Sequence, residues 1–440
     1  MKGPTMFRSL RRRNFRLFLS GQLVSNLGTW MQNVALAWLV LQITHSPFDV
    51  GAVSAVQFVP ALVFGAYGGV VADRFPKRSL LVCTQSGLAL AAAGLAVIDL
   101  SGVKSLWAIY GVTFVSGMFG SIDMPTRQSF VSEMVGLDDL PNAVGLNSAT
   151  FNLTRIGGPA LGALVIELAS VGACFALNAL SYLAVITALL AMRRDELFAG
   201  RRVAHARGQV REGLRYIRQT PRLRHTLLLL AVVGALAFNF NTVLPVLAKT
   251  DFKGDAGTYA LMLIAMGVGS VTGALIAARN RGPRLRVVVA AAAAMGVAML
   301  VAAAARSLAL EVAVLVAVGF FSLLYLSTTN STCQLASAPE MRGRVMGVYS
   351  VIFTGSTPVG ALLIGLVDQE FGARWGFVVG AVPTLIAAAV LGVVLLRRDG
   401  TGPILPRSRL ARQRGTGSRS TGTRRARTFG GRYTGGPATS

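Results

Sequence analysis

The sequence predicts an all-α integral membrane protein with twelve transmembrane helices in two six-helix bundles. Of its 440 residues, 53% are hydrophobic and only 14% are charged, whereas an ordinary soluble domain carries about 25% charged residues. Apolar runs recur along most of the chain, and a run of about 20 residues spans a bilayer core of about 30 Å as a helix. The second half of the chain also repeats features of the first. A membrane β-barrel would instead show alternating segments of about 10 residues, which this sequence lacks.

The internal repeat is clearest in two short segments, each set between apolar runs. The stretch GGVVADRFPKR, from Gly68 to Arg78, has a weaker echo in GALIAARNRGPR, from Gly273 to Arg284. The two segments begin 205 residues apart. Three further pairs are each separated by 202 residues, namely Gly145 and Gly347, Ser148 and Ser350, and Gly158 and Gly360. Two copies of one half predict two bundles of equal helix number.

Twelve apolar runs are assigned as membrane spans. They cover residues 17–42, 48–72, 79–100, 106–128, 142–166, 171–192, 225–248, 258–278, 286–305, 308–334, 344–367 and 374–396. The predicted domains are a first bundle (1–192), a cytoplasmic linker with an amphipathic helix (193–222), a second bundle (223–398) and a disordered basic tail (399–440). The linker helix fits either a helix on the membrane surface or a simple tether between the bundles.

The basic residues set the orientation of the helices. The formal net charge is +25, which in a soluble protein would indicate nucleic-acid binding. With the N-terminus inside, however, only five of the 43 basic residues fall in outside loops, namely Lys104, Lys249, Lys253, Arg306 and Arg374. This is the positive-inside asymmetry of membrane proteins. It predicts both termini in the cytoplasm, a lipid bilayer as surroundings and no nucleic-acid partner.

A motif at the inner end of the second span carries a family resemblance. Gly69, Asp73, Arg74, Lys77 and Arg78 follow the spacing G-x-x-x-D-R-x-x-K-R, which resembles the cytoplasmic signature of the major facilitator superfamily. That resemblance implies that the glycine permits close helix contact, the aspartate braces the eleventh helix and the cations help to close the inner gate. Pro76 stands where the family usually has glycine.

A second resemblance concerns the fourth and fifth spans. MPTRQSF from Met124, LPNA from Leu140 and the glycine-rich stretch after Gly157 resemble bacterial exporters of the macrolide-efflux and enterobactin-exporter type. Gly158, Pro159 and Gly162 also resemble an exporter signature of the fifth helix. Proline removes a backbone hydrogen bond and glycine allows close packing. These residues therefore predict either a hinge or a tight helix contact, and both alternatives stay open.

Polar residues recur within several spans at helical spacing. The candidates for contacts with a substrate are Gln22, Asn26, Asn33, Asn239, Asn241 and Tyr325. In the major facilitator superfamily the first, fourth, seventh and tenth helices line the central cavity, so the resemblance implies cavity lining. Hydrogen bonding between helices is the alternative, worth about 0.6 kcal/mol on average.

Charged residues inside spans are rare and expensive, at about 2.5–3.5 kcal/mol or more at the bilayer centre. Asp123 and Arg127 lie one helical turn apart and can pair, while Arg155 lies deeper in the next span. We expect Asp123 to act in proton coupling or gating, with Arg155 tuning it or contacting substrate. A purely structural Asp123–Arg127 pair is the competing hypothesis. The carboxylates near the outer helix ends, Asp251 and Asp368 among them, are expected to be solvated.

Taken with the resemblance, these features predict a monomeric transporter in a bacterial cytoplasmic membrane. It would export a small amphipathic molecule in exchange for protons by alternating access. The sequence has no nucleotide-binding loop and no metal-ligand spacing, so we expect no cofactor and no metal, and the proton gradient as energy source. An importer or uncoupled facilitator of the same fold is the alternative. A receptor or enzyme is the alternative from another class, and no catalytic cluster favours it.

Overall fold

The computed structural model describes residues 5–198, 209–279, 285–338 and 340–399. The side chains of residues 5–7, 66–70, 73, 137, 209–211, 278–279 and 397–399 are also outside the description. Residues 1–394 form one compact unit, and residues 395–440 are a second unit of which only the helical start is described. The predicted basic tail thus lies outside the described residues from position 400 onward.

Every regular element in the described part is a helix. The first half contains a short 3₁₀ helix η1 (Thr5–Arg11) and helices α1 (Arg13–Thr44), α2 (Pro47–Arg74), α3 (Lys77–Leu100), α4 (Leu106–Leu168) and α5 (Val171–Leu190). The second half contains α6 (Gln209–Gln219), α7 (Pro221–Leu236), α8 (Phe240–Thr250), α9 (Ala256–Arg279), α10 (Leu285–Ala304), α11 (Leu308–Ala336), α12 (Arg342–Phe371) and α13 (Ala373–Asp399).

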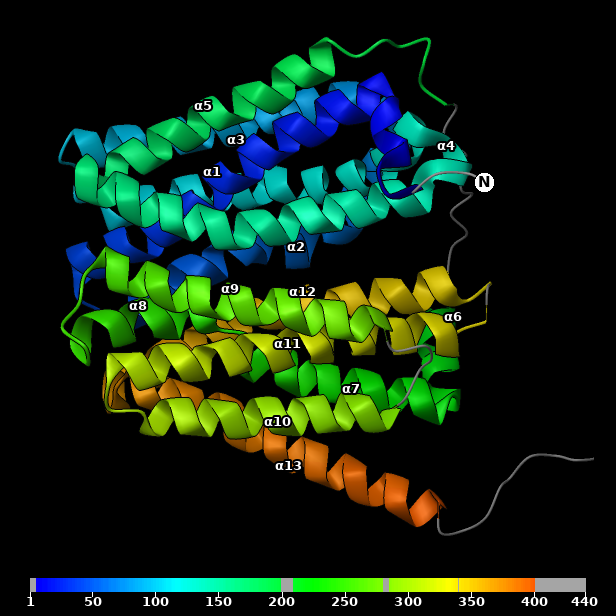
Figure 1. Cartoon of the computed structure of the whole chain (residues 1–440). Helices are drawn as coiled ribbons and strands as arrows, with labels where there is room; N and C mark the ends of the chain where they lie inside the picture. Colours follow the sequence, from blue (N-terminus) through cyan, green and yellow to red (C-terminus); the bar gives the residue numbers. More distant parts are fainter. Residues whose placement is uncertain (1–4, 199–208, 280–284, 339, 400–440) are drawn as a thin grey trace, which may run out of the picture. The chain divides into compact units, whose positions relative to one another are not determined.

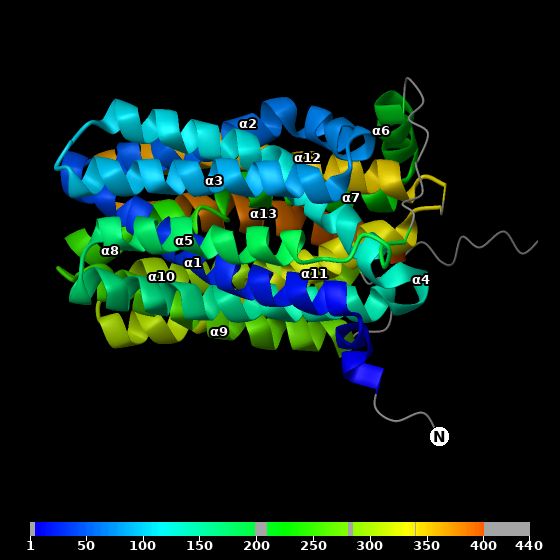
Figure 2. The same cartoon turned by 90° about the horizontal axis from the view of Figure 1, so that it is seen from above.

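The long helices run side by side in two groups. In Figure 1, α1 to α5 form one group and α7 to α12 form the other. The view from above shows the same helices nearly parallel to a common axis (Figure 2). Across the boundary, α2 packs along α12 and α4 packs along α9. Residues 1–394 form a single compact unit. That unit contains both predicted bundles and the linker, so it does not test the boundaries between them, and these stay a prediction.

Nine described segments are long and apolar enough to cross a membrane. They correspond to nine of the twelve predicted spans. The other three predicted spans lie on α1 and on the two limbs of α4. These three segments carry polar and charged residues that lower their hydropathy, including Gln22, Asp123 and Arg155.

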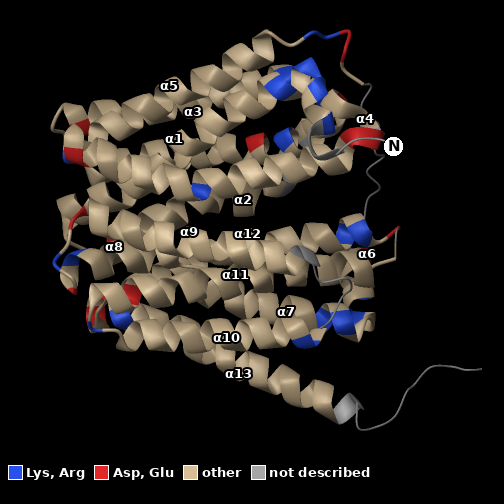
Figure 3. Cartoon of the chain, in the orientation of Figure 1, with Lys and Arg blue, Asp and Glu red and all other residues tan. Residues whose placement is uncertain are grey.

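Charged residues lie mostly at the two ends of the helix groups (Figure 3). One end holds η1 and α6, with many Lys and Arg residues, and is the predicted cytoplasmic end. At the opposite end, which is the predicted outer end, four helices begin with a serine that caps the first turn. The hydroxyl of Ser46 accepts the Asp49 N–H at 3.2 Å, and Ser105, Ser170 and Ser307 cap α4, α5 and α11 in the same way. Serine is favoured at this position because its oxygen satisfies a free N–H of the first turn.

Two predicted spans differ in detail from the structure. The segment between the fourth and fifth spans is helical except at Gly136, where α4 is kinked and a φ of 73° suits glycine. The predicted span 225–248 is two helices, not one. α7 ends at Leu236, and Asn239 precedes α8 with φ −100° and ψ 34°. A continuous apolar run hides such a break, because hydropathy reports burial and not backbone geometry.

The linker helix α6 is attached to the second half. Glu212 of α6 pairs with Arg344 of α12 at 2.7 Å, and the Tyr216 hydroxyl accepts the Ala338 N–H at 3.1 Å. Ile217 is buried. Both contacts hold α6 against the chain near the start of α12.

Candidate functional site: a buried ion pair and a cavity between the halves

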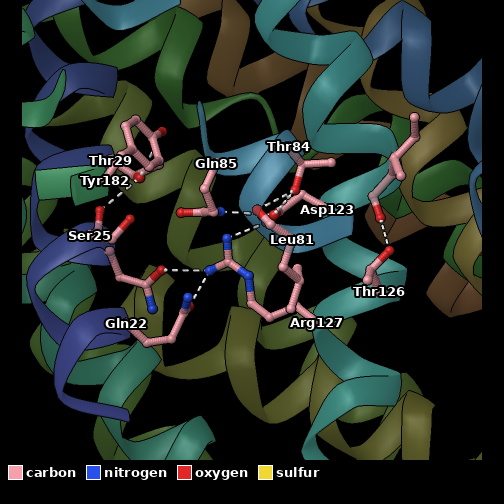
Figure 4. A network of polar contacts seen from close by, with 12 residues as sticks. Gln22, Ser25, Thr29, Leu81, Thr84, Gln85, Asp123, Thr126, Arg127 and Tyr182 are labelled. Atoms are coloured by element: carbon pink, nitrogen blue, oxygen red, sulfur yellow. Dashed lines mark hydrogen bonds and ion pairs between the residues drawn. The ribbon is translucent and has the colours of Figure 1, made fainter. Parts of the chain in front are cut away.

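A buried ion pair joins three helices of the first half. Arg127 of α4 donates to Asp123 one turn earlier on the same helix. The other oxygen of Asp123 accepts hydrogen bonds from α3, from the Thr84 hydroxyl at 2.7 Å and the Gln85 amide at 2.8 Å. Arg127 also donates to the side-chain oxygen of Gln22 in α1. Figure 4 shows these side chains converging from the three helices.

The network satisfies the Asp123 carboxylate almost completely. Asp123 is 4% exposed, and both of its oxygens have charged or polar donors. Asn26 joins more weakly, with its oxygen 3.4 Å from the Arg127 guanidinium. Gln22 and Asn26 therefore contact Arg127, and they are not among the residues that line the cavity described next. Such a pair can hold three helices in register, and its geometry does not test a role in proton coupling. Both hypotheses for Asp123 thus remain open.

A small cavity of about 100 Å³ lies between the two halves. It is lined from α1 and α4 by Trp30, Arg155 and Pro159, and from the second half by Phe238, Phe240, Asn241, Leu263 and Met266. Of the predicted substrate contacts, Asn241 lines this cavity. Arg155 was predicted to tune Asp123 or to contact substrate, and the structure places it in the lining.

Arg155 has no carboxylate partner among the described residues. Its guanidinium lies 5.9 Å from the centre of the Trp30 ring, within the range of a cation–π contact. Asp123 is paired with Arg127 instead, so the direct Asp123–Arg155 bond that the sequence allowed is not formed. The cavity therefore presents one uncompensated positive charge beside three aromatic rings.

The remaining predicted contacts have other places. Asn239 is buried at the α7–α8 break, where its amide donates to the Ala235 carbonyl at 2.7 Å. Tyr325 is fully buried with its ring 6.5 Å from that of Phe238, behind the cavity wall. Asn33 is half-buried on α1. No pattern in the sequence distinguished these residues from Asn241, since all lie in apolar spans.

Two basic residues of the motif at the inner end of the second span, Lys77 and Arg78, contact other helices of the first half. Lys77 pairs with Glu133 of α4. Arg78 donates to the carbonyls of Leu189 and Leu190, at 2.6 and 2.9 Å, and so satisfies acceptors at the end of α5. Arg74 is exposed at the end of α2. The surroundings of Gly69 and the side chain of Asp73 lie outside the description, so the predicted roles of both residues stay predictions.

The glycine-rich stretch of α4 lies against α1. A Cβ atom at Gly158 would meet the Cβ of Trp30 and lie 3.0 Å from the Leu27 carbonyl, and one at Gly162 would lie 3.4 Å from Met31. The helix continues through Pro159. The structure thus supplies the close contact that the sequence offered as one alternative, and it leaves the hinge role a prediction.

Replacing Gly158 with alanine should therefore destabilise the protein. The added methyl group forces α1 and α4 apart, and such overpacking costs about 1–3 kcal/mol. Thermal unfolding of the purified protein in detergent measures the effect. Gly120→Ala is the matched control, because a Cβ atom there meets nothing within 4 Å, and it should leave the unfolding temperature unchanged or raise it. Equal unfolding temperatures for both variants would contradict the close contact.

The hydrogen bonds between described residues of the two halves lie at the predicted outer end. Lys249 of α8 donates to the Leu41 carbonyl at 3.0 Å and lies 3.2 Å from the His45 ring nitrogen. The Ser46 hydroxyl donates to Gln369 of α12 at 3.0 Å. These contacts hold the halves together at that end.

Comparisons with known proteins agree with this architecture. Residues 4–413 match the family described as transmembrane secretion effector. The multidrug efflux pump Tap of Mycolicibacterium fortuitum is 27% identical, over 89% of this chain and 96% of the pump. The staphyloferrin A transporter of Staphylococcus aureus is 21% identical, over 85% of this chain and 94% of that protein. An MFS-type transporter of Bacillus subtilis is 27% identical over 60% of this chain, which spans 63% of that relative.

Solved structures show the same fold. A bacterial homologue of the human lysosomal transporter Spinster, solved in an inward-facing and unoccupied conformation, superposes with a TM-score of 0.70 at 12% identity. The superposition covers 86% of this chain and 96% of that chain. The prediction of an all-α transporter fold of two helix bundles is confirmed by this similarity.

Proposed function

Because this chain belongs to the transmembrane secretion effector family of the major facilitator superfamily, we infer that it exports a small amphipathic molecule in exchange for protons. It is a multi-pass membrane transporter and not an enzyme. The export direction is supported by its similarity to efflux pumps. The cavity between the halves is the observation that carries the proposal, because alternating access requires a site that both halves share.

The lining of the cavity indicates the chemistry of the substrate. Trp30, Phe238 and Phe240 offer apolar ring faces, and Arg155 offers a positive charge without a carboxylate partner among the described residues. A molecule with an aromatic or aliphatic body and one anionic group matches both features. The cavity is smaller than the 300–1,000 Å³ typical of drug-sized sites. The halves must therefore separate further before such a molecule can enter.

The remaining details follow the same reasoning. Protons are the proposed energy source, because the sequence has no nucleotide-binding loop. The cytoplasmic membrane of a bacterium is the proposed location, with the basic end of Figure 3 and both termini in the cytoplasm. A monomer suffices, since one chain supplies both halves of the cavity.

Transport by the purified chain in proteoliposomes tests this function. A panel of amphipathic anions, cations and neutral compounds is offered with and without an imposed proton gradient. We expect anions to accumulate against their concentration gradient only when protons flow the opposite way. Movement that merely equalises the concentrations would indicate an uncoupled facilitator, and movement together with protons would indicate an importer.

A further inference from the structure

Four ionisable side chains lie near one another at the predicted outer end of the second half. They are placed at the ends of four helices and are Asp251 after α8, Glu311 in the first turn of α11, Asp368 in the last turn of α12 and Arg374 in the first turn of α13. Arg374 donates to Asp251 at 2.7 Å. That bond comes from Nε, and the terminal nitrogen Nη1 donates to the carbonyls of Ala303 and Ala305. The only guanidinium of the cluster is therefore already engaged.

The two other carboxyl groups are buried. Glu311 is 0% exposed and Asp368 is 2% exposed. None of their four carboxyl oxygens has a hydrogen-bond partner among the described residues. Asp368 lies against Gly376 of α13, but no hydrogen bond of ordinary geometry forms between them. The expectation from the sequence that Asp368 is solvated is therefore wrong, and Glu311 was not singled out at all.

The other charged groups at this end do not neutralise these carboxyls. Lys249 binds Leu41 and His45 of the first half. Asp255 accepts the N–H and the hydroxyl of Thr258, at 2.9 and 3.1 Å. The remaining charged side chains at this end of the second half are Lys253, Arg306 and Glu370. All three are exposed, and none forms an ion pair with a described residue.

Arg374 pairs with Asp251, so Glu311 and Asp368, both shielded from water, have no ion-pair partner among the described residues. A buried ionised carboxylate without a donor is unfavourable by several kcal/mol and takes up a proton instead. We propose that Glu311 and Asp368 form a proton-binding site at the predicted outer end, separate from the Asp123–Arg127 pair and from the cavity. Each carboxyl binds one proton from the water at that end when the end is open, and becomes buried as it closes.

The position of the site can link the pH of the outside solution to the contacts that close the outer end of the protein. Asp368 precedes Gln369, which binds Ser46, and Asp251 lies two residues after Lys249, which binds Leu41. Gly376, against which Asp368 lies, and Val243 beside it belong to the second half, so this link requires that separation of the halves at these contacts also loosens the second half around the carboxyls. Protonation consequently favours the closed outer end, and loss of the protons favours its opening. This coupling of protonation to opening and closing rests on the proposed function, which is export in exchange for protons. The binding of protons by Glu311 and Asp368 does not depend on it.

Infrared spectroscopy of the purified full chain tests proton binding directly. At neutral pH the wild-type protein should show the carbonyl stretch of protonated carboxyl groups. Glu311→Gln and Asp368→Asn should each remove part of that band, and Glu370→Gln, an exposed control at the same end, should leave it unchanged. A wild-type spectrum without the band, or a band that both buried variants retain, would overturn the proposal.

Thermal unfolding provides an independent measurement. Stability falls with rising pH wherever the folded state holds more protons than the unfolded chain. The unfolding temperature of the wild type should therefore fall as the pH rises from about 4, where a carboxyl group of the unfolded chain loses its proton, through neutral pH, and the fall should be smaller in Glu311→Gln and smallest in the double variant Glu311→Gln/Asp368→Asn. Equal falls in the wild type and the double variant would contradict the site. Neither measurement requires transport, so a failure of the proposed export would leave these results standing.

Discussion

Replacing Asp123 with alanine is expected to cause the largest loss of stability of any single substitution proposed for this chain. The change leaves the Arg127 guanidinium partly buried without its carboxylate, and it removes the acceptor of Thr84 and Gln85. Removing one partner of a buried ion pair costs about 3–5 kcal/mol. Thermal unfolding of the purified chain in detergent should show a large decrease in the unfolding temperature, and Asp138→Ala, at an exposed carboxyl on the same helix, should show almost none.

Two further variants separate a structural role from proton coupling. In Asp123→Asn/Arg127→Gln both charges are absent, and an amide at each position can still form hydrogen bonds. This double variant should therefore be more stable than Asp123→Ala. If it also drives transport from a proton gradient at the wild-type rate, the coupling role of Asp123 is excluded. An Asp123→Ala protein that unfolds like the wild type would instead contradict the structural importance of the pair.

The second large effect is expected on transport. Arg155→Gln should reduce the transport of an amphipathic carboxylate, such as an aromatic dye with one carboxyl group, by roughly 10–100-fold. A hydrogen bond to a charged group is worth about 1.5–3 kcal/mol, and each 1.36 kcal/mol corresponds to about tenfold. Initial rates at low substrate concentration in proteoliposomes measure the change.

Matched variants make this result specific. Arg155→Lys keeps the charge but not the planar donor group, so it should retain part of the rate. Arg306→Gln removes an exposed arginine at the predicted outer end and should have little effect. Transport of a neutral analogue of the dye should be the same in the wild type and Arg155→Gln. Equal losses for the charged and neutral compounds would mean that Arg155 supports the structure of the cavity and does not recognise an anion.

The fold was predictable because membrane spanning leaves a strong signal in the sequence. A bilayer requires long apolar runs with internally bonded backbones, and these runs predicted the helical class directly. The same reasoning could not place the break before Asn239, since the residues on both sides are apolar. It also could not show that the chain between the fourth and fifth spans continues as helix up to and beyond Gly136.

The site was predictable only where spacing along one helix decides the contact. Asp123 and Arg127 lie four residues apart, and that spacing puts them on one face. The partners in α1 and α3, and the position of Arg155 beside Phe238 and Asn241, depend on how distant segments pack. Glu311 and Asp368 were missed for a related reason. Carboxyl groups near the ends of apolar runs are usually exposed, and only the packing of neighbouring helices reveals that these two are covered.

The break between α7 and α8 divides one membrane crossing into two mechanically separate rods. The outer rod, α8, is fastened to the first half through Lys249 and Leu41, whereas the inner rod, α7, packs along α12. A rotation confined to the short segment between Leu236 and Phe240 would move α8 and leave the contacts between α7 and α12 unchanged. Opening of the protein at its outer end would then require the displacement of only about three helical turns of this membrane crossing.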